Sequence, residues 1–75
     1  MLDSISILTD EDLQVLCFLQ SVGHSGVNKI RRDISALIQF GLAFENEGYY
    51  YISDTGRSTY ARFGAEINRR LGLTE

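Results

Sequence analysis

The single histidine and the single cysteine are the residues most able to support catalysis or metal binding. His24 lies between Ser21 and Ser25, and a serine beside a histidine can act as a nucleophile with its general base. Such a pair also needs a third group that orients the base, and no acidic residue lies close to this loop in the sequence. We therefore expect no enzyme activity and interpret His24 as a loop residue.

A metal site would need Cys17 and His24 together with two carboxylates. Cys17 lies inside the apolar segment 15–19, which favours a buried, inert thiol, so we expect neither a metal ion nor a cofactor. A lone cysteine cannot form an internal disulfide, and an unpaired thiol is typical of a reducing compartment. Neither a basic leader nor an apolar run of ~20 residues is present, so we expect a cytoplasmic protein without a membrane span.

Composition and charge limit the class of protein. The 75 residues are 44% hydrophobic and 23% charged, which predicts one globular domain over residues 1–75 and argues against disorder. The net charge of −3 is unevenly distributed, because acidic residues predominate in 1–24 and 45–54 and basic residues in 25–44 and 55–75. Local potential steers a partner more than the total charge does. The basic segments are therefore the candidate binding surface.

Two helices are predicted in the first half of the chain. Thr9 and Asp12 have the spacing of a capping box, which predicts a helix over 10–22. Apolar residues then recur at steps of three and four from 27 to 40, which predicts a second helix with one apolar and one polar face. The polar face contains Asn28, Lys29, Arg31, Arg32, Ser35 and Gln39.

A β-hairpin is predicted next. Segments 42–45 and 49–52 are rich in aromatic and β-branched residues and flank an Asn-Glu-Gly turn at 46–48. Alternation places Tyr49 and Tyr51 on one face of this two-stranded ribbon. These tyrosines either cover the apolar stripe of the following helix, which we favour, or are anchors at an interface.

Ser53 is placed to cap a last helix that begins at Asp54 and ends near Gly72. Its apolar stripe extends beyond what so small a domain needs to cover its core, so we expect a homodimer. The residues expected at the dimer contact are Phe63, Ile67 and Leu71. The charged residues expected on the exposed far side are Arg62, Glu66 and Arg70.

Two short motifs, Leu37-x-x-x-Gly41-Leu42-Ala43 and Tyr50-x-Ile52-Ser53-x-x-Gly56-Arg57, accompany this order of elements. Together they resemble the winged helix-turn-helix superfamily, in particular MarR-type and PadR-type regulators and small archaeal and phage winged-helix proteins. The resemblance covers about residues 9 to 70. It implies a mainly helical α+β fold of about three helices, with a hairpin wing between a recognition helix and a C-terminal helix.

The resemblance implies a transcriptional regulator that reads the major groove of double-stranded DNA with the helix at about 27–40. The implied roles are guanine contacts for Arg31 or Arg32, adenine contacts for Asn28 or Gln39, and phosphate contacts for Ser35 and Lys29, with Arg57 as a further contact. Segment 23–40 is short for the two helices and turn of this family, so the scaffolding helix is expected to be very short or missing.

The tip of the predicted wing is acidic. It reads Glu45-Asn46-Glu47-Gly48, and phosphate would repel these carboxylates, so we expect the wing to be held away from DNA. The alternative function is a protein-interaction module of winged-helix shape, which binds a protein partner through this acidic wing and the tyrosines. The sequence leaves both functions open.

Overall fold

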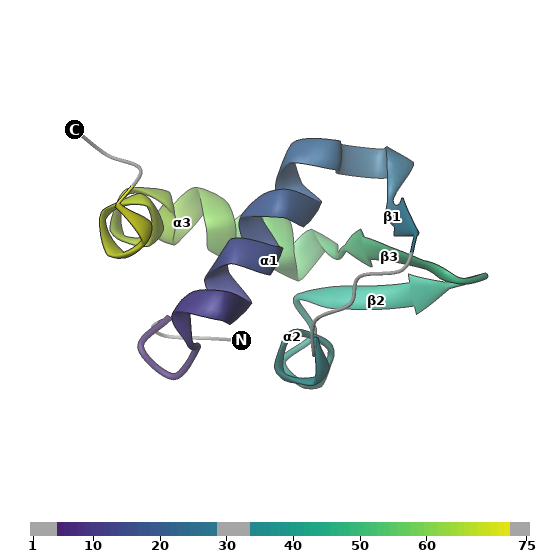
Figure 1. Cartoon of the computed structure of the whole chain (residues 1–75), viewed down its shortest axis with the longest axis horizontal. Coiled ribbons are helices and arrows are strands. Elements are labelled where there is room, and N and C mark those ends of the chain that lie inside the picture. Colours follow the sequence, from purple (N-terminus) through teal and green to yellow (C-terminus); the bar gives the residue numbers. More distant parts are fainter. Residues whose placement is uncertain (1–4, 29–33, 73–75) are drawn as a thin grey trace.

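A computed structural model describes residues 5–28 and 34–72, which form a small, mostly helical α+β domain (Figure 1). The elements are α1 (Asp10–Val22), the 3-10 helix η1 (Gly23–Ser25), β1 (Val27–Asn28), α2 (Ser35–Gln39), β2 (Ala43–Asn46), β3 (Tyr49–Ile52) and α3 (Asp54–Leu71). Helices α1 and α3 pack against each other, and the sheet lies at one end of the molecule. In the described part of the chain, no helix is both long enough and apolar enough to cross a bilayer.

The prediction for the first helix is confirmed. The backbone N–H of Asp12 donates to Thr9 Oγ1 at 3.1 Å, and the N–H of Thr9 donates to Asp12 Oδ2 at 3.2 Å, so the capping box is complete. α1 ends at Gly23, whose φ of 61° is easily reached only by glycine. It is the central helix of the core. The buried apolar residues are Ile5, Leu8, Leu13, Val15, Leu16, Leu19, Ile34, Leu37, Leu42, Ala43, Ile52 and Ile67.

The prediction of a helix from residue 27 is wrong at its first two residues, because Val27 and Asn28 form strand β1. Val27 pairs with Tyr50 and Asn28 with Tyr49, which makes the sheet three-stranded and antiparallel in the order β1-β3-β2. Val27 fits the apolar period of a helix, but its packing beside Tyr50 against the core satisfies the same burial in a strand. Residues 29–33 of the predicted helix lie outside the described residues.

The C-terminal end of α2 explains the Leu37…Gly41-Leu42 motif. Gly41 has a φ of 74°, its N–H donates to the carbonyl of Ile38, and the N–H of Leu42 donates to the carbonyl of Leu37 at 2.8 Å. This pattern is a Schellman motif, which satisfies the last carbonyls of a helix while the chain reverses. Leu37 and Leu42 are both completely buried, as the apolar contact of that motif requires. The motif fixes the angle between α2 and the hairpin.

The hairpin is confirmed, with its strands at 43–46 and 49–52. Glu45 pairs with Tyr50 and Asn46 with Tyr49, which leaves Glu47 and Gly48 as the two turn residues. Both have positive φ, 53° at Glu47 and 82° at Gly48, as a type I′ turn requires. Asparagine and glycine adopt this conformation readily, whereas glutamate does so with strain.

Replacing Glu47 by Asn should therefore stabilise the domain by about 1 kcal/mol, because asparagine tolerates the left-handed conformation better. Urea unfolding followed by circular dichroism measures the change. Gly48→Ala at the neighbouring turn position should destabilise the domain, since its φ is also positive. Equal stability of Glu47→Asn and the parent chain would contradict the strain assigned to Glu47.

The start of α3 is fixed against the end of α2. Ser53 Oγ accepts from the N–H of Gly56 at 2.9 Å and donates to the carbonyl of Gly41. The N–H of Ser53 donates to the carbonyl of Leu42 at 3.0 Å. A Cβ at Gly56 would lie 2.1 Å from that same carbonyl oxygen, so only glycine lets the helix approach so closely. The Ile52-Ser53-x-x-Gly56 motif therefore joins the wing, α2 and α3.

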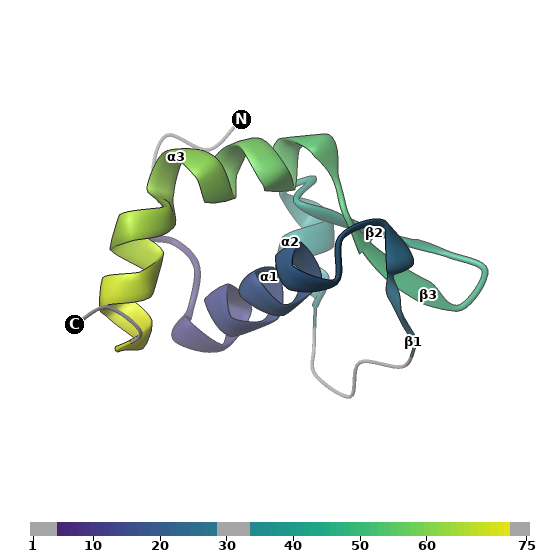
Figure 2. The ribbon, with the colours of Figure 1, turned by 90° about the horizontal axis from the view of Figure 1, so that it is seen from above.

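Helix α3 is bent at Phe63, whose φ of −112° and ψ of 15° depart from helical values (Figure 2). Gly64 follows, and a residue without a side chain does not crowd the bend. The bend directs the second half of α3 along the N-terminal turn of the chain. Ile67, which lies in this second half, is completely buried in the core.

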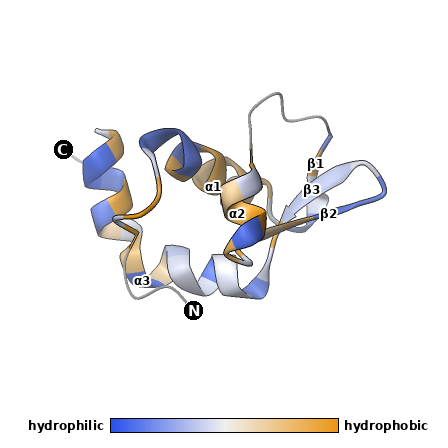
Figure 3. Ribbon diagram, turned by 90° about the horizontal axis from the view of Figure 1, so that it is seen from below, coloured by the Kyte–Doolittle hydropathy of each residue, from blue (hydrophilic) through white to orange (hydrophobic). Residues whose placement is uncertain are grey.

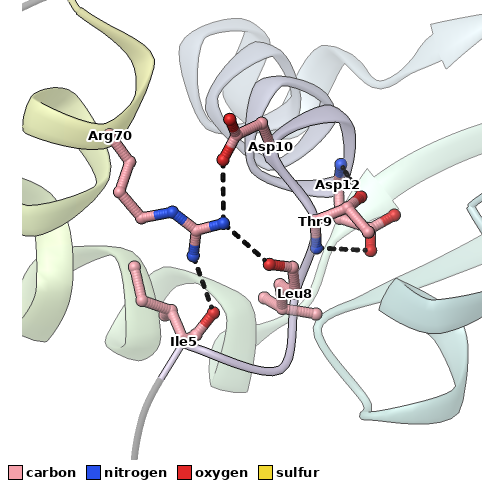
Figure 4. Close-up of polar contacts among 6 residues, drawn as sticks. All are labelled: Ile5, Leu8, Thr9, Asp10, Asp12 and Arg70. Carbon is pink, nitrogen blue, oxygen red and sulfur yellow. Dashed lines mark hydrogen bonds and ion pairs between the residues drawn. The ribbon is translucent and has the colours of Figure 1, made fainter.

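The second half of α3 binds the N-terminal turn through Arg70 (Figure 4). Its guanidinium donates from Nη1 to the carbonyl of Ile5 at 3.1 Å, and from Nη2 to the carbonyl of Leu8 at 3.0 Å and to Asp10 Oδ1 at 2.8 Å. The expectation that Arg70 lies on an exposed far side is therefore wrong. Arg70 lies in the part of α3 that follows the bend, and its guanidinium is held by acceptors at the start of the described chain.

Candidate functional site

The exposed side of α2 carries two of the residues assigned to DNA. Ser35 and Gln39 are both exposed and lie four positions apart, so they occupy one side of the helix. Ile38 is also exposed, whereas Ile34 and Leu37 are buried on the opposite side. The predicted division of this helix into a polar and an apolar face therefore holds at Ile34, Ser35, Leu37 and Gln39 and is wrong at Ile38, which was expected on the apolar face.

The remaining residues assigned to the recognition helix lie elsewhere. Lys29, Arg31 and Arg32 lie outside the described residues. Asn28 is exposed in β1, opposite Tyr49, and cross-strand partners share a face of the sheet. Its assignment to the polar face of the helix is therefore wrong, because strand pairing places it beside the hairpin tyrosines.

Arg57, the last residue assigned to DNA, lies in the first turn of α3. Its guanidinium forms an ion pair with Asp54 in the same turn, where the carboxylate also suits the positive end of the helix dipole. The side chain of Asp54 is 94% exposed and that of Arg57 is 37% exposed. Arg57 is accessible, but the carboxylate beside it offsets its charge.

The end of the hairpin is hydrophilic and projects from the body of the domain (Figure 3). Glu45, Asn46 and Glu47 are all exposed. The two carboxylates therefore meet solvent at the tip, as the acidic pattern of the sequence predicts. A phosphate backbone next to this tip would be repelled.

The outer face of the sheet is aromatic. Tyr50 and Ile52 point to the core, so the alternation places Phe44, Tyr49 and Tyr51 on the other face. Phe44 and Tyr51 stack with ring centroids 5.3 Å apart, and the rings of Tyr49 and Tyr51 lie 6.5 Å apart. The interpretation of Tyr49 and Tyr51 as a cover for the last helix is therefore wrong.

A hollow of about 240 Å³ opens beside this aromatic face. It is lined by Gly23, His24, Phe44, Tyr51, Ile52, Ser53, Asp54 and Arg57. The hollow depends on η1, which lies against β3, and local sequence pattern does not predict this long-range contact. The glycine-rich segment 23–26 before a β-branched residue was the signal that could have indicated a turn into a strand.

The Cys17 thiol and the His24 imidazole lie in different surroundings. Cys17 packs against the core and has a hydrogen-bond interaction with the Tyr60 phenol, which raises the pKa of Tyr60, with burial as the next cause. His24 is exposed at the hollow. Within residues 5–28 and 34–72, no three histidine, cysteine or acidic side chains are grouped closely enough to hold a metal ion.

The three residues assigned to a dimer contact differ in exposure. Ile67 is completely buried within one chain, so it belongs to the core and cannot itself contact a second copy. Phe63 and Leu71 are half-buried and pack against the same core. The homodimer remains a prediction, and light scattering at high micromolar concentration measures it.

No family model, curated protein or solved structure matches this chain.

Proposed function

We propose that this chain is a winged-helix domain that binds double-stranded DNA, with α2 directed to the major groove and the β2–β3 hairpin as the wing. The observation that carries the proposal is the exposed pair Ser35 and Gln39 on a helix whose other side is buried. The Schellman motif at Gly41 and the Ser53 hydroxyl hold this helix at a fixed angle to the hairpin. Support also comes from the element order, which has a helix directly before the hairpin and another directly after it.

The side chains on the exposed side of α2 can form the hydrogen bonds that the major groove of DNA offers. A glutamine at one end of α2 can bond adenine through its amide, and a serine at the other can donate to phosphate. Positive charge for binding DNA is present in the sequence, because Lys29, Arg31 and Arg32 come shortly before α2. Arginine is the side chain best suited to bidentate contact with guanine. These three cations are therefore the main proposed source of affinity, and Arg57 with its neighbouring carboxylate is secondary.

The acidic tip of the hairpin limits how the domain can be oriented on DNA. Glu45 and Glu47 are exposed at the end of the hairpin, so docking with the tip against the backbone of DNA would bring like charges together. We propose that the wing lies away from the phosphates and that base contacts come from α2. Substituting both glutamates by Gln would then leave sequence preference unchanged.

The test is the salt dependence of binding to a duplex of mixed sequence. Arg31→Ala with Arg32→Ala should weaken duplex binding and flatten its salt dependence, because two cations proposed to face the DNA are lost. The matched control is Arg62→Ala with Arg69→Ala, which removes the same charge from exposed positions on α3. Equal losses in the two variants, or no binding by the parent chain at low salt, would refute the proposal.

A second candidate function is a protein-interaction module. The specific observation in its favour is the exposure of two aromatic rings on the sheet, 45% at Phe44 and 40% at Tyr49. Large aromatic residues exposed together are enriched at protein interfaces. Duplex titration at low salt separates the functions, because a protein-interaction module would show no salt-sensitive affinity for DNA.

A further inference from the structure

The exposed side of α2 contains an apolar side chain that the core does not use. Ile38 is 44% exposed, although the spacing of the apolar residues predicts it on the buried side. Ser35 lies three residues before Ile38 and four before Gln39, and residues at these spacings are neighbours on a helix surface. The side of α2 that faces the core is formed by Ile34 and Leu37. Core packing therefore does not account for an isoleucine at position 38.

The backbone holds Ile38 in a defined position. Its N–H donates to the carbonyl of Ile34 at 3.0 Å, and its carbonyl accepts from the N–H of Gly41 at 3.0 Å, within the Schellman motif that ends the helix. Isoleucine is branched at Cβ and has one strongly preferred χ1 rotamer in a helix. Such a side chain loses little conformational entropy when it contacts a partner. The exposed side of α2 therefore holds a preorganised apolar group between polar neighbours.

The major groove of DNA offers one apolar group that matches this side chain. Every base edge there has hydrogen-bond donors or acceptors, and thymine adds its C5-methyl group. Isoleucine has no side-chain donor or acceptor, so against the other bases it would displace water without replacing the hydrogen bonds. Against thymine, both apolar groups leave water. Helix α2 has no acidic residue that would repel the neighbouring phosphates.

Gln39 extends the same preference, because its amide can form two hydrogen bonds with adenine. Consecutive Cα atoms lie about 3.8 Å apart and stacked base pairs about 3.4 Å apart, so Ile38 and Gln39 can reach the same base pair or adjacent ones. We propose that Ile38 contacts the C5-methyl group of thymine and that α2 thereby selects A·T base pairs. This inference rests on the proposed binding of DNA and names the base pair that the site prefers.

The experiment compares two duplexes that differ only in this methyl group. The first alternates adenine and thymine between short clamps of guanine–cytosine pairs, and the second has deoxyuridine in place of every thymine. Fluorescence anisotropy titrations at low salt give the ratio of the two affinities for each protein. The parent chain should bind the thymine duplex about fourfold more tightly, as expected for the burial of one methyl group. Ile38→Ala should bind both duplexes with equal affinity.

The matched control is Ile7→Ala, which makes the same substitution at an isoleucine that is 58% exposed and lies outside α2. It should keep the ratio of the parent chain. Ile38→Val retains part of the apolar surface and should give an intermediate ratio. Because both duplexes are titrated with the same preparation, a smaller folded fraction in one variant does not change its ratio. Any effect of the methyl group on the DNA itself is common to all variants and cancels when their ratios are compared.

The results separate the explanations. The role of Ile38 is overturned if the parent chain binds both duplexes equally, if Ile38→Ala keeps the preference for thymine, or if Ile7→Ala also loses it. A lower mass of Ile38→Ala in light scattering, with the ratio unchanged, would overturn it in favour of an interface between copies of the chain. Absence of salt-sensitive binding to either duplex would refute the proposed function itself, whereas salt-sensitive and equal binding to both refutes only this inference.

Discussion

The Gly56→Ala variant is expected to lose about 3 kcal/mol of the free energy of unfolding. Its new methyl group would lie 2.1 Å from the carbonyl oxygen of Leu42 and 2.7 Å from Cγ1 of Ile52. The first of these atoms is backbone and also accepts the hydrogen bond of the Ser53 N–H, so it cannot move without breaking the junction between α3 and the hairpin. A domain of this size has a total stability of the same order, about 4 to 11 kcal/mol. Urea unfolding followed by circular dichroism measures the loss.

Gly64→Ala is the matched control in the same helix. A Cβ at Gly64 would meet only Cε1 of Tyr60, at 3.9 Å, which is an ordinary contact. Alanine also favours the helix over glycine by up to about 1 kcal/mol. Gly64→Ala should therefore keep or raise the stability. A loss at Gly64 as large as that at Gly56 would show that glycine is needed in α3 for flexibility rather than for the close approach to Leu42.

Replacing Arg70 by Met should lower the stability by about 2 kcal/mol. Methionine keeps most of the aliphatic stem but leaves the carbonyls of Ile5 and Leu8 without their charged donor. The ion pair with Asp10 contributes less, because the carboxylate is 63% exposed and solvent screens it. Asp10→Asn should accordingly cost under about 1 kcal/mol.

Arg69→Met provides the comparison for Arg70, since Arg69 is the adjacent arginine and its residue is exposed. Its substitution should leave the midpoint of thermal unfolding nearly unchanged. Hydrogen exchange adds a local readout, because Arg70→Met should release the N-terminal turn before the rest of the domain. Equal losses in Arg69→Met and Arg70→Met would indicate a general effect of net charge and would exclude the carbonyl contacts as the cause.

Local signals in the sequence predicted the elements that depend on local chemistry. Thr9 and Asp12 defined the start of α1, Glu47 and Gly48 lie where the hairpin turn was expected, and Ser53 caps α3. Each of these features is decided by residues at most three positions apart. The exposure of Ser35 and Gln39 was predicted in the same way, from the period of the apolar residues, but the same period wrongly placed Ile38 on the buried side.

Features decided by distant pairing were missed. β1 is only two residues long and exists because Val27 meets Tyr50, which lies far along the chain. Arg70 binds the carbonyl of Ile5, which lies far from it in the sequence, and periodicity does not reveal the bend at Phe63. The prediction that Tyr49 and Tyr51 cover the last helix was wrong for the same reason, because the side of the hairpin that meets the core depends on where α1 and β1 lie. Local sequence patterns predict the helices and strands, whereas the contacts between these elements depend on tertiary packing.

The bend at Phe63 gives α3 two separate attachments. Its first half is held at the sheet by Ser53 and Gly56, and its second half holds the N-terminal turn through Arg70. Opening the second half therefore exposes the carbonyls of the N-terminal turn, while the hairpin keeps its own contacts. Hydrogen exchange should therefore show the beginning and the end of the described chain opening together, before the sheet and the start of α3 open.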